Sequence, residues 1–290
     1  RCVQETAPGQ SKPALGVVID ALRRMEYRGY DSAGIALLDG SGGMAVEKKA
    51  GKLDNLVATV ESAGLENYPA TTGIGHTRWA THGRPTDINA HPHVDQLGKI
   101  AVVHNGIIEN FAPLHAELEA QGVEFTSETD TETVTHLLHA EYYGEGPNAG
   151  NFTASVMAVI NRLEGAFTLV IAHADHPDML MACRRSTPLV IGVGEHQMFL
   201  GSDVAAFIEH TREAVELGQD NVVTITADGY TITDFEGNPV EGRPFTIDWD
   251  LEAAEKCGYD YFMLKEIAEQ PQACLLYTSD AADDTPCPHI

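Results

Sequence analysis

The chain has 290 residues, 43% of them apolar, which is enough to bury a sizeable core in one large domain or two small ones. Its 18 Lys and Arg residues face 43 Asp and Glu residues, for a formal net charge of −25. This charge repels phosphate backbones and anionic lipid. Because no local basic patch offsets it, the composition excludes the usual basic kind of nucleic-acid or membrane-surface protein.

Targeting and redox features are also absent from the sequence. No apolar run approaches the roughly 20 residues of a membrane span, and no charged start followed by an apolar run resembles a secretion signal. The cysteines are scattered without a C-x-x-C pair, which favours reduced thiols in a cytoplasmic protein. Any single one could be a nucleophile: Cys2, Cys183, Cys257, Cys274 and Cys287.

The predicted elements alternate between helical and strand periods along the chain. Apolar residues spaced at three and four between Leu15 and Met25 predict a first helix that begins near Ser11 and Pro13. Strand-like runs follow at 74–81, 99–106, 167–174, 189–194 and 197–202, with two further helices at 130–143 and 154–163. At 221–235, Asp228-Gly229 between β-branched runs predicts a hairpin. Short loops between several strands favour antiparallel pairing, so we predict two sheets packed face to face with helices outside.

The two ends of the chain do not follow this pattern. The opening, residues 1–8, lacks an initiator Met and an apolar strand. From Cys274 the helical pattern of the 261–273 stretch stops, and "CLLYTSDAADD" resembles the translation of a sequencing-library adapter. We therefore divide the chain into a doubtful segment 1–8, a body 9–273 and a non-native tail 274–290.

Three polar groups lie at predicted strand ends or in the loops that follow them: "HTRWATHG" (76–83), "VVHNGIIEN" (102–110) and "SETDTE" (127–132). Taken singly, Arg78 fits a solvated strand face, Asn105-Gly106 a turn, and Asp130 a helix N-cap. Taken together they suit a binding site. An arginine can clamp a carboxylate, an aspartate can hold an ammonium group, and Asn105 with the Gly106 N–H can form an oxyanion hole. This set describes a site for a free α-amino acid whose side-chain carbonyl is attacked.

These strings, with "LRRMEYRGYDSAGIA" (22–36), resemble the glutaminase domain, a class II glutamine amidotransferase, of the isomerising glutamine–fructose-6-phosphate aminotransferases (glucosamine-6-phosphate synthases). The resemblance extends from about Gly9 to Ala273 through "STPLVIG", "GSDVAAFIEHT" and "YFMLKEIAEQP". It implies an α+β fold of the N-terminal-nucleophile hydrolase type, a four-layer αββα sandwich of two antiparallel sheets. It also implies hydrolysis of glutamine to glutamate and ammonia for transfer to fructose 6-phosphate, in a cytoplasmic enzyme without a cofactor or metal whose full-length parent is a homo-oligomer.

The resemblance assigns a role to each site residue. Arg78 would bind the α-carboxylate of glutamine and Asp130 its α-ammonium, while Asn105 and Gly106 would stabilise the oxyanion. The remaining pocket residues, which would shape the loop around the amino acid, are Trp79, Thr81 and His82. In the family a mature N-terminal cysteine attacks the amide with its own α-amine as base, and Cys2 occupies roughly that place.

The opening departs from the family pattern, because Arg1 precedes Cys2 and moves the free amine one residue away. Cys2 is then either the nucleophile or a chance match. One alternative is a catalytically inactive domain that keeps the glutamine pocket. A less favoured one is a metal-dependent hydrolase, because imidazole is a common metal ligand and five histidines lie close together in the sequence: His76, His82, His91, His93 and His104. The fructose 6-phosphate half is absent beyond Ala273, so these residues alone would not complete the synthase reaction.

Overall fold

The computed structural model describes residues 2–6 (backbone only), 14–80 and 83–248, together with Leu264, Ile267, Ala268 and Gln270. The chain divides into two compact units, Arg1–Ile247 and Asp248–Ile290. In the second unit, the four described residues between 264 and 270 are helical, where the sequence shows a helical pattern. The predicted tail at 274–290 lies outside the described residues.

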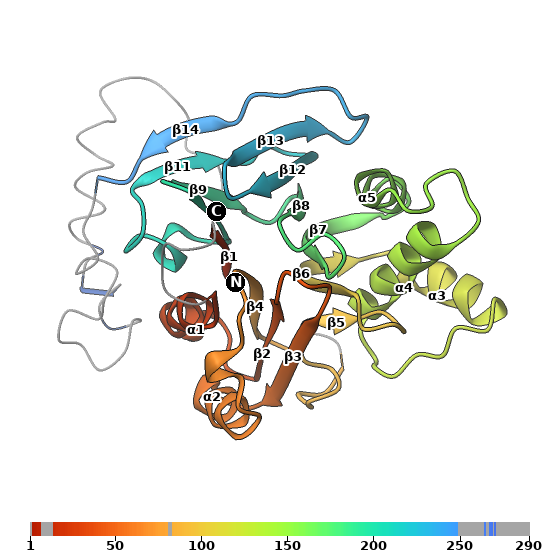
Figure 1. The fold of residues 1–290 in the computed structure, drawn as a ribbon, viewed down its shortest axis with the longest axis horizontal. Coiled ribbons are helices and arrows are strands. Elements are labelled where there is room, and N and C mark those ends of the chain that lie inside the picture. The colour runs from red at the N-terminus through yellow and green to blue at the C-terminus, as the bar shows by residue number, and fades with distance from the viewer. Residues whose placement is uncertain are drawn as a thin grey trace. The chain divides into compact units, whose positions relative to one another are not determined.

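Two sheets form the centre of the first unit (Figure 1), and the paired strands in both are antiparallel. The eight-stranded sheet has the order β14-β11-β9-β10-β1-β4-β2-β3. Its strands are β1 (Cys2–Thr6), β2 (Ser32–Leu38), β3 (Met44–Ala50), β4 (Thr72–Arg78), β9 (Val190–Gly194), β10 (Gln197–Gly201), β11 (Glu213–Glu216) and β14 (Arg243–Thr246). The six-stranded sheet has the order β13-β12-β8-β7-β6-β5. Its strands are β5 (His93–Val94), β6 (Ile100–Ile108), β7 (Gly165–His173), β8 (Leu180–Arg185), β12 (Asn221–Thr226) and β13 (Gly229–Asp234).

The helices of the first unit form two separate groups (Figure 1). One group contains α1 (Ala14–Met25) and α2 (Leu53–Ser62), and the other contains α3 (Phe111–Ala120), α4 (Asp130–Tyr143) and α5 (Phe152–Ile160). Single turns of 3₁₀ helix occur at Glu26–Arg28, Leu65–Asn67 and Val204–Ala206.

Three hydrophobic clusters show how these elements are layered. One cluster packs α1 and α2 against alternate residues of β2, such as Ile35 and Leu37. A second cluster lies between the two sheets, where Ala36 of β2 meets Val103 of β6. A third packs α3, α4 and α5 against the other face of β6, at residues such as Val102. Since successive residues of a strand point to opposite faces, these clusters define four layers, and the predicted αββα sandwich is confirmed.

Most of the predicted elements are present. The three predicted helices correspond to α1, α4 and α5, and the predicted strand runs correspond to β4, β6, β7, β9 and β10. The predicted hairpin is formed by β12 and β13, in which Thr226 pairs with Gly229 across a two-residue loop.

The sequence shows no apolar strand at the opening of the chain, and the strand that forms there is mostly polar. Residues 2–6 form β1, in which Cys2 pairs with Gly201 of β10 and Val3 with Ile74 of β4. The slot between β4 and β10 supplies backbone hydrogen-bonding partners on both sides, so pairing there does not require an apolar segment. Because β1 and β4 are antiparallel, Cys2 at the start of β1 lies toward the C-terminal end of β4, where Arg78 is the last residue.

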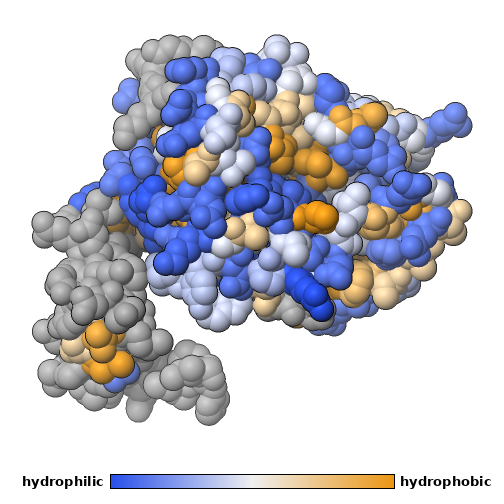
Figure 2. Space-filling view, turned by 90° about the horizontal axis from the view of Figure 1, so that it is seen from below, coloured by the Kyte–Doolittle hydropathy of each residue, from blue (hydrophilic) through white to orange (hydrophobic). Residues whose placement is uncertain are grey.

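The surface agrees with the acidic composition. Figure 2 shows a mostly hydrophilic face on which hydrophobic residues form small separate groups. Among the described residues, no helix has the length and apolar character needed to cross a membrane.

Candidate active site

A cavity of about 370 Å³ opens where the ends of several elements meet. The C-terminal end of β4, the outer half of β6 and the first turn of α4 each contribute side chains to its walls. The lining residues are His76, Arg78, Trp79, His91, His104, Asn105, Gly106, Ile107, Thr129, Asp130 and Thr187. Every predicted pocket residue whose side chain the structure describes is among them.

Arg78 is the last residue of β4 and is 6% exposed. Its guanidinium donates to the carbonyls of Gly83 and Arg84 at 3.4 and 3.5 Å. Burial lowers the pKa of Arg78, while the carboxylates of Asp31 and Asp130 oppose that shift. A guanidinium stays protonated in proteins, so Arg78 brings a positive, two-pronged donor to the cavity wall.

Asp130 is the first residue of α4, where the helix dipole favours a negative charge. One carboxylate oxygen accepts the Ile108 N–H at 2.8 Å. The other accepts from the Thr131 hydroxyl at 3.3 Å and lies 3.6 Å from His104 Nδ1. Burial acts to raise the pKa of Asp130, but the contacts with His104, Ile108 and Thr131 outweigh it, so the pKa is lower than its ordinary value. The cavity therefore has an anionic group as well as a cationic one.

Asn105 and Gly106 are consecutive residues of β6. The Asn105 carbonyl accepts from the Thr187 hydroxyl at 3.2 Å. The Thr187 hydroxyl also contacts the Thr168 hydroxyl at 2.6 Å. Among the described residues, the buried Asn105 Oδ1 has no hydrogen-bond partner. Gly106 has a φ of +122°, and a Cβ built there would lie 1.9 Å from the Ala166 carbonyl oxygen. This backbone thus requires glycine, and it places an N–H next to an amide side chain at the cavity.

Trp79 directly follows β4 and is 57% exposed. Its ring meets the exposed Tyr30 ring edge to face, with a centroid separation of 5.5 Å. Of the two rings, that of Trp79 lines the cavity, next to Arg78 in the chain.

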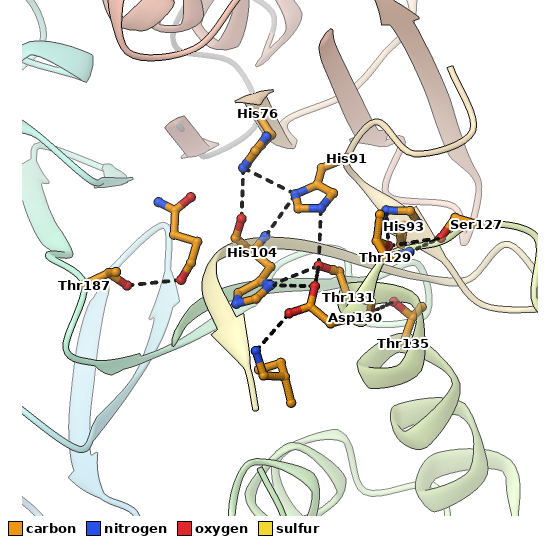
Figure 3. A network of polar contacts seen from close by, with 12 residues as sticks. His76, His91, His93, His104, Ser127, Thr129, Asp130, Thr131, Thr135 and Thr187 are labelled. Carbon is orange, nitrogen blue, oxygen red and sulfur yellow. Dashed lines mark hydrogen bonds and ion pairs between the residues drawn. The ribbon is translucent and has the colours of Figure 1, made fainter. Parts of the chain in front are cut away.

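Four buried histidines lie at and beside the cavity wall: His76, His91, His93 and His104 (Figure 3). His76 Nε2 lies 3.0 Å from the His104 carbonyl and 3.3 Å from His91 Nδ1. His93 Nε2 contacts the Thr129 hydroxyl at 2.9 Å. Burial lowers the pKa of His91 well below its ordinary value and that of His93 to about 3, so both rings are neutral.

Two observations bear on the alternative of a metal-dependent hydrolase. Each of the four rings uses a nitrogen for a hydrogen bond with a neighbouring side chain or carbonyl. Over residues 14–80 and 83–248, no group of three or more His, Cys, Asp or Glu could hold a metal ion. The fifth histidine, His82, lies outside the described residues.

The remaining predicted site residues fall at the limits of the described structure. Thr81 and His82 lie outside it, and for Cys2 only the backbone is described. Cys183, which the sequence left open as a nucleophile, is buried in the core, and burial raises the pKa of its thiol to about 12. A thiol with this pKa is not a nucleophile near neutral pH.

Sequence reasoning missed three residues of the cavity wall: Ile107, Thr129 and Thr187. Ile107 follows Gly106 and Thr129 precedes Asp130 in the chain, so their position next to predicted site residues could have identified both. Thr187 belongs to a segment that carries the family resemblance, but its spacing gives no sign that it reaches Asn105, 82 residues earlier.

Comparisons with known proteins show what this chain is similar to. Residues 76–209 match a family model described as a glutamine amidotransferase domain. The chain is 67% identical over 270 residues to glutamine–fructose-6-phosphate aminotransferase [isomerizing] of Mycolicibacterium smegmatis, covering 90% of this chain and 43% of that protein. For the Streptomyces coelicolor protein of the same name, identity is 60% over 263 residues, covering 90% of this chain and 41% of the relative. The chain thus spans less than half the length of these relatives.

One solved structure has a fold similar to that of this chain. Glutamine phosphoribosylpyrophosphate amidotransferase from B. subtilis, solved with ADP and GMP, aligns with a TM-score of 0.67 at 22% identity, covering 82% of this chain and 49% of that one. At this identity the likeness concerns the fold alone, and it agrees with the predicted N-terminal-nucleophile hydrolase architecture. Residues 76–209 are thus similar to a glutamine amidotransferase domain, and the chain is similar to part of the isomerising glutamine–fructose-6-phosphate aminotransferases.

Proposed function

We propose that this domain hydrolyses L-glutamine to L-glutamate and ammonia. The observation that carries the proposal is the single cavity that combines the Arg78 guanidinium, the Asp130 carboxylate and the Asn105-Gly106 pair. An arginine and an aspartate together match the opposite charges of a free α-amino acid. The Asn105 amide and the Gly106 N–H are then the donors for an oxyanion that forms at the side-chain carbonyl.

In this proposal Cys2 is the nucleophile. In a chain that begins at Cys2, the α-amine of Cys2 takes the thiol proton and the thiolate attacks the glutamine Cδ, while Asn105 and Gly106 hold the tetrahedral oxyanion. The C–N bond then breaks as the α-ammonium returns the proton to the amide nitrogen, so that ammonia leaves and a thioester remains. Water then hydrolyses the thioester and releases glutamate. The register of β1 supports this role, because it places Cys2 toward the end of β4 that carries Arg78. Trp79, Thr81 and His82 would close around the amino acid.

The ammonia would be transferred to fructose 6-phosphate by a longer protein, since the relatives that carry this name are more than twice as long as the matched region. We further propose that this longer protein is cytoplasmic and homo-oligomeric. The transfer proposal rests on the name and length of the relatives, and the cavity itself bears only on the glutamine step.

Two measurements on one protein test the glutamine step. Calorimetry should detect binding of L-glutamate but not of D-glutamate, and a coupled assay should detect ammonia released from L-glutamine by a chain that begins at Cys2. Cys2→Ala is the matched control, which should keep L-glutamate binding and lose turnover. The absence of L-glutamate binding would refute the proposal. Binding without turnover in the chain that begins at Cys2 would instead support an inactive glutamine-binding domain.

A further inference from the structure

The hydroxyl of Thr131 is the point where the histidine network meets Asp130 (Figure 3). Thr131 is the second residue of α4 and is fully buried. Its Oγ1 lies 3.2 Å from His91 Nε2, 3.0 Å from His104 Nδ1 and 3.3 Å from Asp130 Oδ1. One hydroxyl therefore contacts three titratable side chains that come from three separate segments of the chain.

The proton on His91 can be placed from its partners. The backbone N–H of His104 donates to His91 Nδ1 at 3.4 Å, so Nδ1 carries a lone pair. His76 Nε2 faces both this nitrogen and the His104 carbonyl, and a carbonyl can only accept, so the His76 proton is on Nε2. Since His91 is neutral, its own proton is on Nε2 and is donated to Thr131.

The hydroxyl proton of Thr131 then has two possible acceptors, Asp130 Oδ1 and His104 Nδ1. Donation to His104 would place the His104 proton on Nε2, a buried atom without a hydrogen-bond partner among the described residues. A buried N–H without an acceptor is costly. Donation to Asp130 leaves His104 Nδ1–H free to point at the Thr131 oxygen and the Asp130 carboxylate. The second arrangement is therefore favoured.

This arrangement fixes the Asp130 carboxylate from three directions. Oδ1 receives the Thr131 hydroxyl and faces His104 Nδ1–H, and Oδ2 receives the Ile108 N–H. A carboxylate has about four lone-pair sites, so roughly one remains for a ligand in the cavity. We propose that Thr131 is a positioning residue for amino-acid recognition: its hydroxyl holds the Asp130 carboxylate in the orientation that receives the α-ammonium group. This inference rests on the proposed function, in which Asp130 binds that group.

Two ligands separate this role from a general structural one. L-Glutamate carries an α-ammonium group, and glutarate is the same dicarboxylate without it. In the full chain, Thr131→Val should weaken L-glutamate binding on the order of tenfold, the size of one charge-assisted hydrogen bond. Glutarate binding should stay within about twofold, because glutarate makes no contact with Asp130. Thr131→Ser keeps the hydroxyl and should restore L-glutamate affinity to within about threefold.

The same helix offers a matched control. Thr133 is also fully buried, but its hydroxyl has no hydrogen-bond partner within the described residues. Thr133→Val should therefore leave the affinity for both ligands unchanged. If circular dichroism shows that Thr131→Val does not fold, Thr131→Ala provides the same comparison.

The outcomes distinguish this inference from the proposed function. If the unmodified chain binds L-glutamate and Thr131→Val weakens both ligands equally, or neither, the positioning role is refuted and the glutaminase proposal stands. If the unmodified chain does not bind L-glutamate, both are refuted. A loss confined to L-glutamate and reversed by Thr131→Ser supports the inference.

Discussion

Replacing Gly106 by alanine tests the geometry of the cavity floor. The added Cβ would lie 1.9 Å from the Ala166 carbonyl oxygen and 2.8 Å from Phe167 Cα, whereas real Cβ contacts below 3.0 Å are essentially never seen. Both obstructing atoms belong to the backbone of β7, so no side chain can rotate away. We therefore expect β6 and β7 to separate locally in Gly106→Ala, by about 1 Å at the closest contact.

The energetic cost follows from this geometry. A non-glycine residue at φ +122° carries backbone strain of about 1–3 kcal/mol. Loss of one or two ladder hydrogen bonds adds about 1–3 kcal/mol. Gly106→Ala should therefore lower the free energy of unfolding by about 2–6 kcal/mol. Gly122 is the control, because its φ is +88° and no atom lies within 4 Å of a Cβ built there. Gly122→Ala should cost only about 1–2 kcal/mol.

Urea unfolding followed by circular dichroism measures both variants against the unmodified chain. In the chain that begins at Cys2, Gly106→Ala should also depress ammonia release more than Gly122→Ala, because the shifted strand moves the proposed oxyanion donor. If Gly106→Ala cost no more than Gly122→Ala, the tight approach of β7 to Gly106 would be refuted.

Three further predictions concern the charged and polar groups. Arg78→Ala should weaken L-glutamine binding by about 1.5–3 kcal/mol, the size of a charge-assisted pair, and an unchanged KM for glutamine would contradict this. Asn105→Ala should lower kcat by roughly 100-fold to 1000-fold with little change in KM, whereas a raised KM at constant kcat would make Asn105 a binding residue instead. Burial lowers the pKa of His93 to about 3 and that of His173 to about 4. Between pH 6.5 and 4 the unfolded chain then takes up protons that the folded chain does not, so the free energy of unfolding should fall on acidification by about 1.4 kcal/mol per pH unit per histidine. Urea titrations across this range should show a smaller slope for His173→Asn, and an unchanged slope would refute the assignment to His173.

The secondary structure could be predicted where the sequence pattern of a segment agrees with the structure that its surroundings favour. The helix at 130–143 begins and ends where its pattern indicates, and the 221–235 hairpin follows from a turn signal between β-branched runs. The edge strand β3 was not predicted, because "MAVEKKA" contains several good helix formers and all its residues are only partly buried. Its pairing with β2 decides its conformation. The polar strand β1 was missed for the same reason, since partner strands rather than its own side chains define it.

The sequence predicts which residues belong to the site but not the hydrogen bonds that join them. Arg78, Asn105 and Asp130 stand out because charged and amide groups at the ends of strands and at the start of a helix suggest chemistry. The buried histidines could equally have been metal ligands, because sequence does not show what each ring nitrogen faces. Only the structure shows that Thr131 lies between His91 and His104, which come from separate segments.

The walls of the cavity come from residues as far apart in the chain as His76 and Thr187. No shorter fragment brings β4, β6, the start of α4 and the Thr187 segment together, so the binding site forms only when both sheets have closed on one another. A ligand that binds there binds the folded domain alone, and by mass action it should stabilise the whole domain by about 2.7 kcal/mol at a concentration 100 times its Kd. A rise in melting temperature with L-glutamate concentration therefore reports that the two-sheet domain is assembled. A truncated chain that lacks β7 to β10 should show no ligand-dependent shift in melting temperature.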